Sequence, residues 1–340
     1  MPDYWRAQKL LSKDPRLCEQ AAEQAVLKSG GDFPAAQLLQ CRALAALGEW
    51  DAALGGFSLI KDPRTCPIEP LLSLGEAALQ ADQLQLADRT LSAARRPGKL
   101  DARTAELLVR LKLRLQLRDQ VLPLCRDWQV ADPNAALPWA IAAETEVAQF
   151  DLGSAIADFR EALRRSPPGE LERSLRASLA NLLVHTGEVS EARAQFDILL
   201  KSGPLPEKLR LDYAQLLRME GKTDQALQEV ENYLGEHPRD IEGLKRRGLM
   251  LMDLGRWEAA LSDLKAALAE NEVDSGTHHL LAQIYRRMNQ PDPAEQHLQR
   301  SRELMEITTR ISELEEQLRQ EPTNTTQLRE LKELRKLLAR

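Results

Sequence analysis

Residues Leu244–Ala267 read LKRRGLMLMDLGRWEAALSDLKAA, and this stretch decides the fold. Apolar residues recur at three- and four-residue intervals on both sides of a turn that contains Gly255, which is the spacing of amphipathic helices. Trp257 opens the second run, and Ala260 follows it by three residues. We predict two antiparallel helices joined by a short turn. Such a pair cannot bury its apolar face alone, so it requires similar neighbours.

The same unit recurs along the chain, and the alanine at position 260 shows its period. Equivalent residues lie 34 positions apart, with one step of 37 that places a three-residue insertion near Glu170–Glu172. A small residue recurs because the two helices of a unit cross closely at this point, where a larger side chain would separate them. The series consists of Ala53, Ala87, Val121, Ala155, Ala192, Ala226, Ala260 and Ala294.

A 34-residue period with this pattern resembles the tetratricopeptide repeat (TPR) family, whose pattern is matched in part by Leu244, Gly248, Leu251, Ala260 and Leu264. The resemblance implies an all-α fold, a right-handed α-solenoid superhelix of about nine TPR helix-turn-helix units with a C-terminal helical cap. We expect the solenoid over 1–308 and capping or extended helices over 309–340. The expected units are about 1–33, 34–67, 68–101, 102–135, 136–169, 173–206, 207–240, 241–274 and 275–308.

Composition narrows the class of protein. The 340 residues are 43% hydrophobic and 29% charged with a net charge of -6, which indicates a folded protein and no nucleic-acid partner. The four cysteines include no C-x-x-C pair, so we expect free thiols, with Cys41 and Cys125 buried. No apolar run reaches the roughly 20 residues that span a bilayer. The first residues lack the features of a signal peptide, so we expect a cytoplasmic protein, with a removed N-terminal anchor or signal as the open alternative.

Catalytic motifs are absent from the sequence. It contains no G-x-x-x-x-G-K-[ST], G-x-G-x-x-G, H-E-x-x-H or G-x-S-x-G. His278 and His279 are adjacent, and adjacent helical residues point in different directions, so they do not predict a metal site. We therefore predict a chain that is not an enzyme and has no catalytic residues, cofactor or metal.

Three charged residues depart from the repeat pattern. The run at 107–119, LLVRLKLRLQLRD, alternates like a strand, but the 34-residue phase on both sides favours a helix. Lys112 and Glu146 occupy equivalent positions that are usually apolar, and two interpretations stay open: a local rotation that exposes Lys112, or a Lys112–Glu146 pair. The pairing hypothesis predicts that Glu146→Gln lowers stability more than a surface change does. Arg247 occupies another normally apolar position.

The C-terminal residues extend beyond the repeats. Leu304, Ile307, Ile311, Leu314 and Leu318 follow alternating three- and four-residue steps up to a break at Glu321–Pro322. A last helix follows, with Asn324 as its predicted N-cap. We favour a cap over the end of the solenoid, and therefore a monomer. A dimer through a coiled coil is the alternative, although each seam spans only about two heptads.

The remaining candidate for function is the surface. In TPR arrays the first helices line the concave groove, so their inward faces are the expected binding surface. On these faces the last four units carry six cationic residues against three acidic ones, although the net charge of the chain is negative. The same faces of the four units over 34–169 are charge-balanced and rich in leucine, which suggests an apolar groove there. The cations are Lys208, Arg218, Lys245, Arg246, Arg286 and Arg287, the acids are Asp212, Glu242 and Asp253, and Asn181, Gln215, His279 and Gln283 add hydrogen-bonding groups.

These residues predict a groove that binds a protein or peptide segment, with an acidic part of the segment held in the basic half of the groove. The predicted binding residues are Asn181, Lys208, Arg218, Lys245, Arg246, Gln283 and Arg286. An accidental charge bias on a solvated face is the alternative. A TPR clamp for chaperone C-terminal carboxylates does not fit: at its positions stand Ala177, Asn181, Asp212, Glu242 and Arg246, of which two agree. We predict a non-catalytic interaction scaffold. The alternative is a self-associating assembly factor acting through the C-terminal helices, beside a membrane or free of one.

Overall fold

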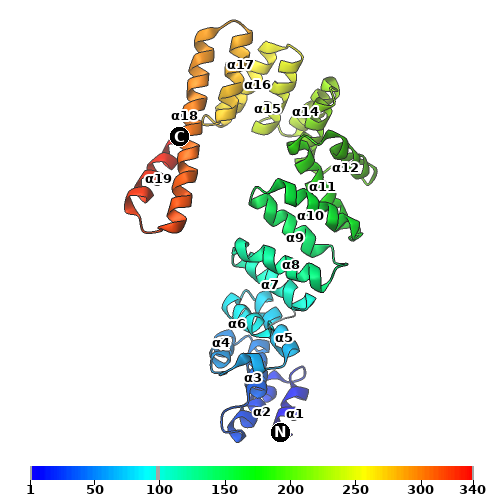
Figure 1. The fold of residues 1–340 in the computed structure, drawn as a ribbon, viewed down its shortest axis with the longest axis vertical. Coiled ribbons are helices and arrows are strands. Elements are labelled where there is room, and N and C mark those ends of the chain that lie inside the picture. Colours follow the sequence, from blue (N-terminus) through cyan, green and yellow to red (C-terminus); the bar gives the residue numbers. More distant parts are fainter. Residues whose placement is uncertain (1, 97–99, 339–340) are drawn as a thin grey trace. The chain divides into compact units, whose positions relative to one another are not determined.

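The computed structural model describes residues 2–96 and 100–338. The chain is 80% helical, and no strand occurs over these residues, so the predicted all-α fold is confirmed. Within each unit, most helices that follow one another in the chain pack together (Figure 1). By the density of internal contacts the chain divides into two compact units, Met1–Leu175 and Arg176–Arg340, and the division falls inside one helix, α11.

The first unit contains ten complete helices and two single 3₁₀ turns among its described residues, the turns being Pro63–Thr65 and Arg118–Gln120. The helices are α1 (Pro2–Leu10), α2 (Pro15–Lys28), α3 (Pro34–Ala46), α4 (Trp50–Ser58), α5 (Ile68–Gln80), α6 (Leu84–Ala94), α7 (Ala102–Arg114), α8 (Val121–Ala131), α9 (Leu137–Ala148) and α10 (Leu152–Arg164). After α11 (Gly169–Thr186), the second unit continues through α12 (Val189–Lys201), α13 (Glu207–Met219), α14 (Thr223–Glu236), α15 (Ile241–Asp253), α16 (Trp257–Glu270), α17 (Ser275–Arg287), α18 (Pro291–Gln320) and α19 (Thr325–Leu338).

The recurring small residues lie where the helices of a pair cross. All eight members of the Ala260 series are at most 1% exposed. Gly248 and Gly75 stand at the small position of the first helix. A Cβ added at Gly248 would lie 3.0 Å from Leu264 Cδ2, and one added at Gly75 would lie 2.5 Å from Leu91 Cδ2. The close approach predicted from the sequence is therefore confirmed at these crossings.

The turn inside each pair has one fixed backbone conformation. A residue with φ between +55° and +83° follows the first helix in each of eight pairs, at the same 34-residue phase. Four of these residues are glycine, which adopts this left-handed conformation without strain. The other four are Asp82, Gln116, Phe150 and Asn289, so the turn persists where the sequence offers no glycine signal.

Two predictions about irregular segments are confirmed. The leucine-and-charge run lies largely within α7 and is helical, as the repeat phase required. The insertion at Glu170–Glu172 forms part of the first turn of α11, which has 18 residues where α7, α13, α15 and α17 have 13 each. The chain therefore accommodates the insertion by lengthening a helix, which leaves the following turn in phase.

The two interpretations of Lys112 are both wrong. Lys112 is not exposed, because only 14% of its side chain reaches solvent, and its Nζ lies 2.8 Å from Asp88 Oδ1 on the neighbouring helix α6. Glu146 binds Arg126 instead, at 2.8 Å. A long lysine side chain can bend away from the apolar contact between two helices and reach a carboxylate at the edge of that contact. The position of a residue on a helix face does not predict this.

Glu146 belongs to a cluster of two buried carboxylates and one half-exposed arginine. Arg126 lies 2.8 Å from both the Glu146 and the Asp158 carboxylates, and Glu146 is only 4% exposed. Glu146 Oε2 has no hydrogen-bond partner among the described residues. Burial, with the nearby Asp158 charge, raises the pKa of Glu146 to about 7, against the opposing effect of Arg126. One arginine thus serves two carboxylates that repel each other.

Arginines at other apolar positions have dedicated partners in the second unit. Arg247 forms a two-point ion pair with Asp263, with N–O distances of 2.6 and 2.7 Å. Arg193 binds Glu220 in the same way. Hydrogen bonds from Arg193 lower the pKa of Glu220 to about 2 despite its partial burial. These pairs explain how the repeat tolerates charge near its core.

The four thiols are free and buried, as predicted for Cys41 and Cys125. Burial raises the pKa of Cys18 and Cys66 to about 11 and that of Cys41 and Cys125 to about 12. A thiol with such a pKa is almost wholly protonated at neutral pH, and it behaves as a small apolar side chain.

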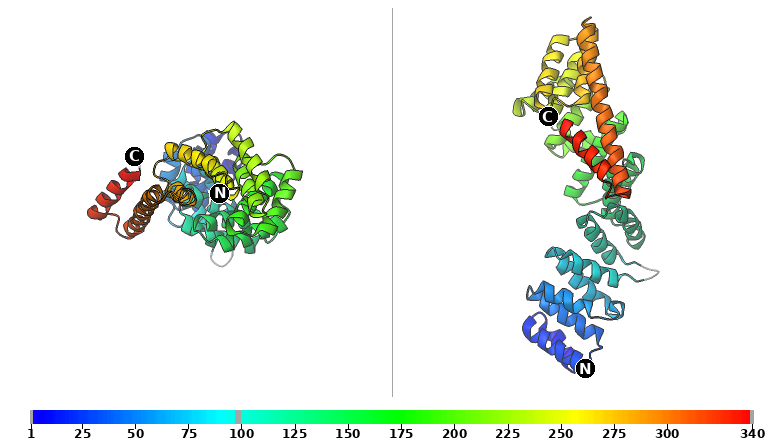
Figure 2. Two further views of the ribbon diagram at one scale, coloured as in Figure 1. Left: turned by 90° about the horizontal axis from the view of Figure 1, so that it is seen from above. Right: turned by 90° about the vertical axis from the view of Figure 1, so that its left-hand side faces the viewer.

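The C-terminal helices form a hairpin. The first part of α18 packs on α17, and α19 turns back beside the remainder of α18 (Figures 1 and 2). The predicted break and N-cap are confirmed, since the Gln327 amide donates to Asn324 Oδ1 over 3.2 Å. Leu304, Leu314 and Leu331 are buried, whereas Leu328 and Leu337 are each 44% exposed. The two-helix hairpin therefore leaves part of its leucine seam uncovered.

Candidate partner-binding surface

The first helices of the second unit carry a row of hydrogen-bonded polar residues. α13 contacts α15, and α15 contacts α17. Asn181 on α11 donates to Asp212 Oδ2 on α13 over 2.7 Å, and Arg246 on α15 donates to Asp212 Oδ1 over 3.2 Å. Arg246 also donates to the Leu211 carbonyl oxygen and to Glu242. The structure thus brings Asn181 and Arg246 together around one carboxylate.

This row continues to α17 through Lys245. Lys245 Nζ lies 3.0 Å from Asp274 and 3.7 Å from Glu242. Asp274 also caps α17, accepting hydrogen bonds from the amides of Gly276 and Thr277. Although burial opposes ionisation, the hydrogen bonds from Thr277 and Lys245 hold the pKa of Asp274 below its usual range. Asp274 was missed in the sequence projection because it precedes the helix.

A second group lies toward the C-terminal ends of the same helices. Arg218 on α13 donates to Asp253 on α15 over 2.7 Å and to Gln215 over 3.2 Å. On α17, Gln283 is hydrogen-bonded to His279 at 2.8 Å. Both members of this last pair are exposed. The polar side chains that were predicted to bind a partner are therefore hydrogen-bonded to other residues of this chain.

Three of the six predicted cations are not held in ion pairs of this kind. Lys208, Arg286 and Arg287 are exposed, and no ion pair to another described residue is formed by them. Lys208 lies at the start of α13, while Arg286 and Arg287 lie at the end of α17, so the free cations do not form one continuous patch. The positive charge that a ligand can contact is therefore smaller than the number of cationic residues on this surface suggests.

The mismatch with a carboxylate clamp has a structural reason. The two positions that agree with it, Asn181 and Arg246, both bind Asp212. Asp212 is buried, and only 12% of the Arg246 side chain reaches solvent. An internal carboxylate thus occupies the donors that a ligand carboxylate would need.

The apolar groove suggested for the first unit is mostly packing. Five leucines of the predicted groove are buried, namely Leu38, Leu39, Leu72, Leu79 and Leu107. Leu113 is partly exposed, and with Leu79 and Leu107 it lines an open hollow of about 600 Å³ between α5 and α7. Arg110, Arg114 and Glu76 stand at this hollow. The apolar surface is therefore local rather than continuous along the four units.

Two further observations bear on possible chemistry. Across the described ranges, no three His, Cys, Asp or Glu side chains converge into a group that could hold a metal ion. In the part of the chain that the structure describes, no helix combines the length and apolar character needed to cross a lipid bilayer.

Comparison with known proteins identifies the repeat. Family models described as tetratricopeptide repeat match residues 141–205 and 177–241, and a second such model matches 240–307. A solved tetratricopeptide repeat protein from Parabacteroides merdae ATCC 43184 is 18% identical, with a TM-score of 0.53 over 70% of this chain and 93% of that one, which shows the shared fold. The chain belongs to the tetratricopeptide repeat family.

A curated relative was also found. Cellulose synthase operon protein C from Xanthomonas axonopodis pv. citri (strain 306) is 25% identical over 144 residues. The match covers 42% of this chain but only 9% of that protein's length. The repeat family and fold together define this chain as a protein–protein interaction scaffold.

Proposed function

We propose that this scaffold is non-catalytic and that the first-helix surface of its second unit binds an acidic segment of a partner protein. The proposal is supported by the exposed residues Arg286 and Arg287, which end α17 and form no ion pair with another described residue. Gln283 and His279 lie on the same helix. Arginine forms strong, two-point hydrogen bonds with carboxylates, and a side chain that is not already paired gives up no internal bond to do so.

The internal pairs assign different roles to the predicted site residues. Asn181, Arg218, Lys245 and Arg246 shape the surface by linking neighbouring helices. We assign the ligand contacts to Lys208 and Arg286, and to the exposed Gln283, whose hydrogen bond to His279 stays within α17. A partner carboxylate that approached Arg246 would have to displace Asp212, which is buried and hydrogen-bonded. We therefore place the principal contacts at the end of α17.

Fluorescence anisotropy with labelled peptides tests the proposal. The probes are a twelve-residue peptide of alternating glutamate and leucine and a matched lysine and leucine peptide. The test variant is Arg286→Glu/Arg287→Glu. The control is Arg302→Glu/Arg329→Glu, which makes the same change in net charge on α18 and α19. We expect the glutamate peptide to bind at low salt and the test variant to weaken it roughly tenfold more than the control does. Equal loss in both variants would show only a net-charge effect and reject the site.

The incomplete seam of the C-terminal hairpin favours self-association as a second candidate function. Leu328 and Leu337 on α19 are half-exposed, and Met305 on α18 is 58% exposed. A second copy of the hairpin would cover such residues in a four-helix arrangement. Light scattering of the full chain over a hundredfold concentration range is the test. A dimer that Leu328→Glu dissociates supports it, and a monomer throughout rejects it. The cytoplasmic location stays a prediction of the sequence.

A further inference from the structure

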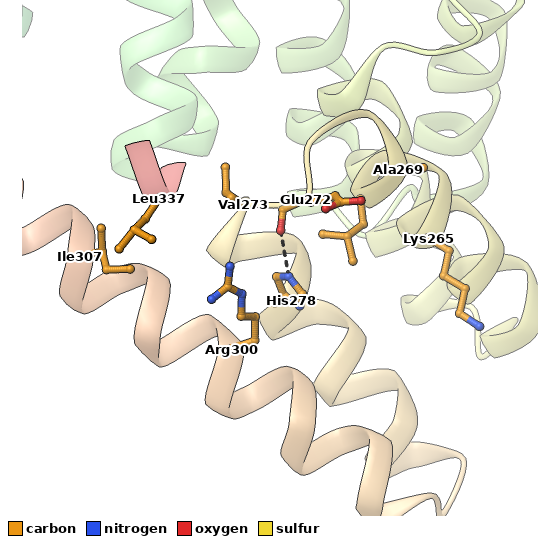
Figure 3. Close-up of a pocket in the computed structure, with 9 residues that line it drawn as sticks. Lys265, Ala269, Glu272, Val273, His278, Arg300, Ile307 and Leu337 are labelled. Carbon is orange, nitrogen blue, oxygen red and sulfur yellow. Dashed lines mark hydrogen bonds between the residues drawn. The ribbon is translucent and has the colours of Figure 1, made fainter. Parts of the chain in front are cut away.

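A cavity of about 540 Å³ lies in the second unit. It is bounded by the end of α16, the following turn, the start of α17, the middle of α18 and the last described turn of α19 (Figure 3). The lining residues are Lys265, Leu268, Ala269, Glu272, Val273, His278, Arg300, Ile307 and Leu337. Its volume is within the range of small-molecule sites.

The cavity wall has an apolar part and a cationic part. Arg300 rises from α18 toward Val273, with Ile307 and Leu337 on one side (Figure 3). Lys265 lies at the opposite edge, and among the described residues Glu272 is the only acidic one of the lining. The ion pair of Arg300 is with Glu303, one turn further along α18, at 3.3 Å and partly exposed to solvent. This weak surface pair leaves the guanidinium able to accept a stronger partner.

We propose that this cavity binds a small amphipathic carboxylate, with the carboxylate at Arg300 and an unbranched aliphatic chain along Ile307 and Leu337. Arg300 and Ile307 are seven residues apart on α18 and so share a face about 10.5 Å apart along the axis, the length of roughly eight to ten methylene carbons. The length of the ligand's aliphatic chain follows from the spacing of Arg300 and Ile307, and its negative charge follows from Arg300.

A histidine pair, of which His278 lines the cavity, gives the site a second signature. His278 Nδ1 lies 2.9 Å from His297 Nδ1, so one ring donates and the other accepts, while His278 Nε2 lies 3.2 Å from the Glu272 carbonyl oxygen. His297 stacks on Tyr285 at 5.5 Å. Burial, followed by the charges of His278 and Lys265, lowers the pKa of His297.

A bound carboxylate would change the balance of charge around this pair. The charged and titratable groups facing it are Lys265 from α16, Glu272 from the turn, Tyr285 from α17 and Arg300 from α18. An anion at Arg300 offsets the positive charges of Arg300 and Lys265, and it therefore opposes the lowering of the His297 pKa. Binding is therefore accompanied by proton uptake at His297, and the affinity rises as the pH falls.

Isothermal titration calorimetry of the full chain with sodium decanoate, below its micelle concentration, tests the proposal. Acetate provides the charge alone, and decanol provides the chain alone. We expect decanoate to bind at least tenfold more tightly than either. Arg300→Gln should weaken decanoate binding roughly tenfold, and Lys265→Gln by a smaller factor. Arg302→Gln is the control, because Arg302 lies on the same helix and lines a separate hollow with Met305.

Proton uptake is measured by repeating the titration at pH 6.5 in buffers of different ionisation enthalpy, and His297→Asn should abolish it. Absence of decanoate binding to the wild-type chain overturns the proposal. Equal affinity for decanol removes the role of the carboxylate and also overturns it. A loss in Arg302→Gln as large as that in Arg300→Gln would show that binding is a general effect of surface charge.

Discussion

Replacing Glu146 with glutamine should stabilise the protein above neutral pH. Glu146 is buried with one unpartnered carboxylate oxygen, and Arg126, its ion-pair partner, is shared with Asp158. Glutamine has the same shape as the protonated acid, it can still accept from Arg126, and it removes the repulsion with Asp158. The variant therefore keeps the hydrogen bond and loses the buried charge.

The magnitude follows from the pKa. The folded-state pKa of Glu146 is raised to about 7 from an ordinary 4.5. Between these values the folded state binds more protons than the unfolded state, so the wild-type free energy of unfolding falls as the pH rises. Each pKa unit corresponds to about 1.4 kcal/mol, which gives at most about 3 kcal/mol lost between pH 4.5 and pH 8. The variant lacks this loss, so its advantage should be near zero at pH 5 and reach about 2 kcal/mol at pH 8.

Urea denaturation at several pH values measures this difference. Tryptophan fluorescence suits it, because four of the five tryptophans lie in the first unit with Glu146. Glu220→Gln is the opposite control: the pKa of Glu220 is lowered to about 2, so its stabilisation is present above pH 4.5 and is lost as the pH falls toward 2. If Glu146→Gln is less stable than wild type by more than about 1 kcal/mol at pH 8, the Arg126 pair outweighs the burial of charge and the reasoning is refuted.

Three further substitutions should change stability in stated directions, each measured by the urea midpoint. Phe150→Gly should stabilise by up to about 1 kcal/mol, because the side chain is 89% exposed and the backbone has φ of 62°; no gain would mean that the turn carries no strain. Gly75→Ala should destabilise by about 1–3 kcal/mol through overpacking, whereas Gly55→Ala, with open space around it, should be neutral or stabilising. Arg246→Ala should lower stability by about 2 kcal/mol because it leaves a buried carboxylate short of a donor, whereas Arg218→Ala should change it by less than about 0.5 kcal/mol. Equal effects of the two would refute the distinction between the buried Arg246–Asp212 pair and the more exposed Arg218–Asp253 pair.

The fold could be predicted because its determinants repeat. Packing of Ala260 against Gly248 and Leu264 depends only on residue size and position in a fixed period, and the sequence displays both. The same phase also predicted α7 correctly where local alternation favoured a strand. The left-handed turn at Phe150 could be placed from the phase alone, although no glycine marks it.

The pairing of charges could not be predicted to the same degree. Helix phase places Lys112 and Arg246 on the right helices, but long side chains select partners by reach and rotamer, and Asp88 and Asp212 were therefore not assigned to them. Asp274 shows a second limit, since it binds Lys245 from a position outside the projected helix. The location of the candidate surface followed from sequence, but which of its cations are free required coordinates.

The four buried cysteines give the protein a natural labelling scheme. Cys18, Cys41, Cys66 and Cys125 all lie in the first unit, and the chain has four cysteines in total. A protonated, buried thiol does not react with a disulfide reagent until the surrounding helices open. Thiol exchange kinetics on the unmodified chain would therefore report opening of the first unit alone, without an engineered probe. The second unit could then be given a single cysteine of its own, at Ala260 or Ala294, to compare how readily the two open.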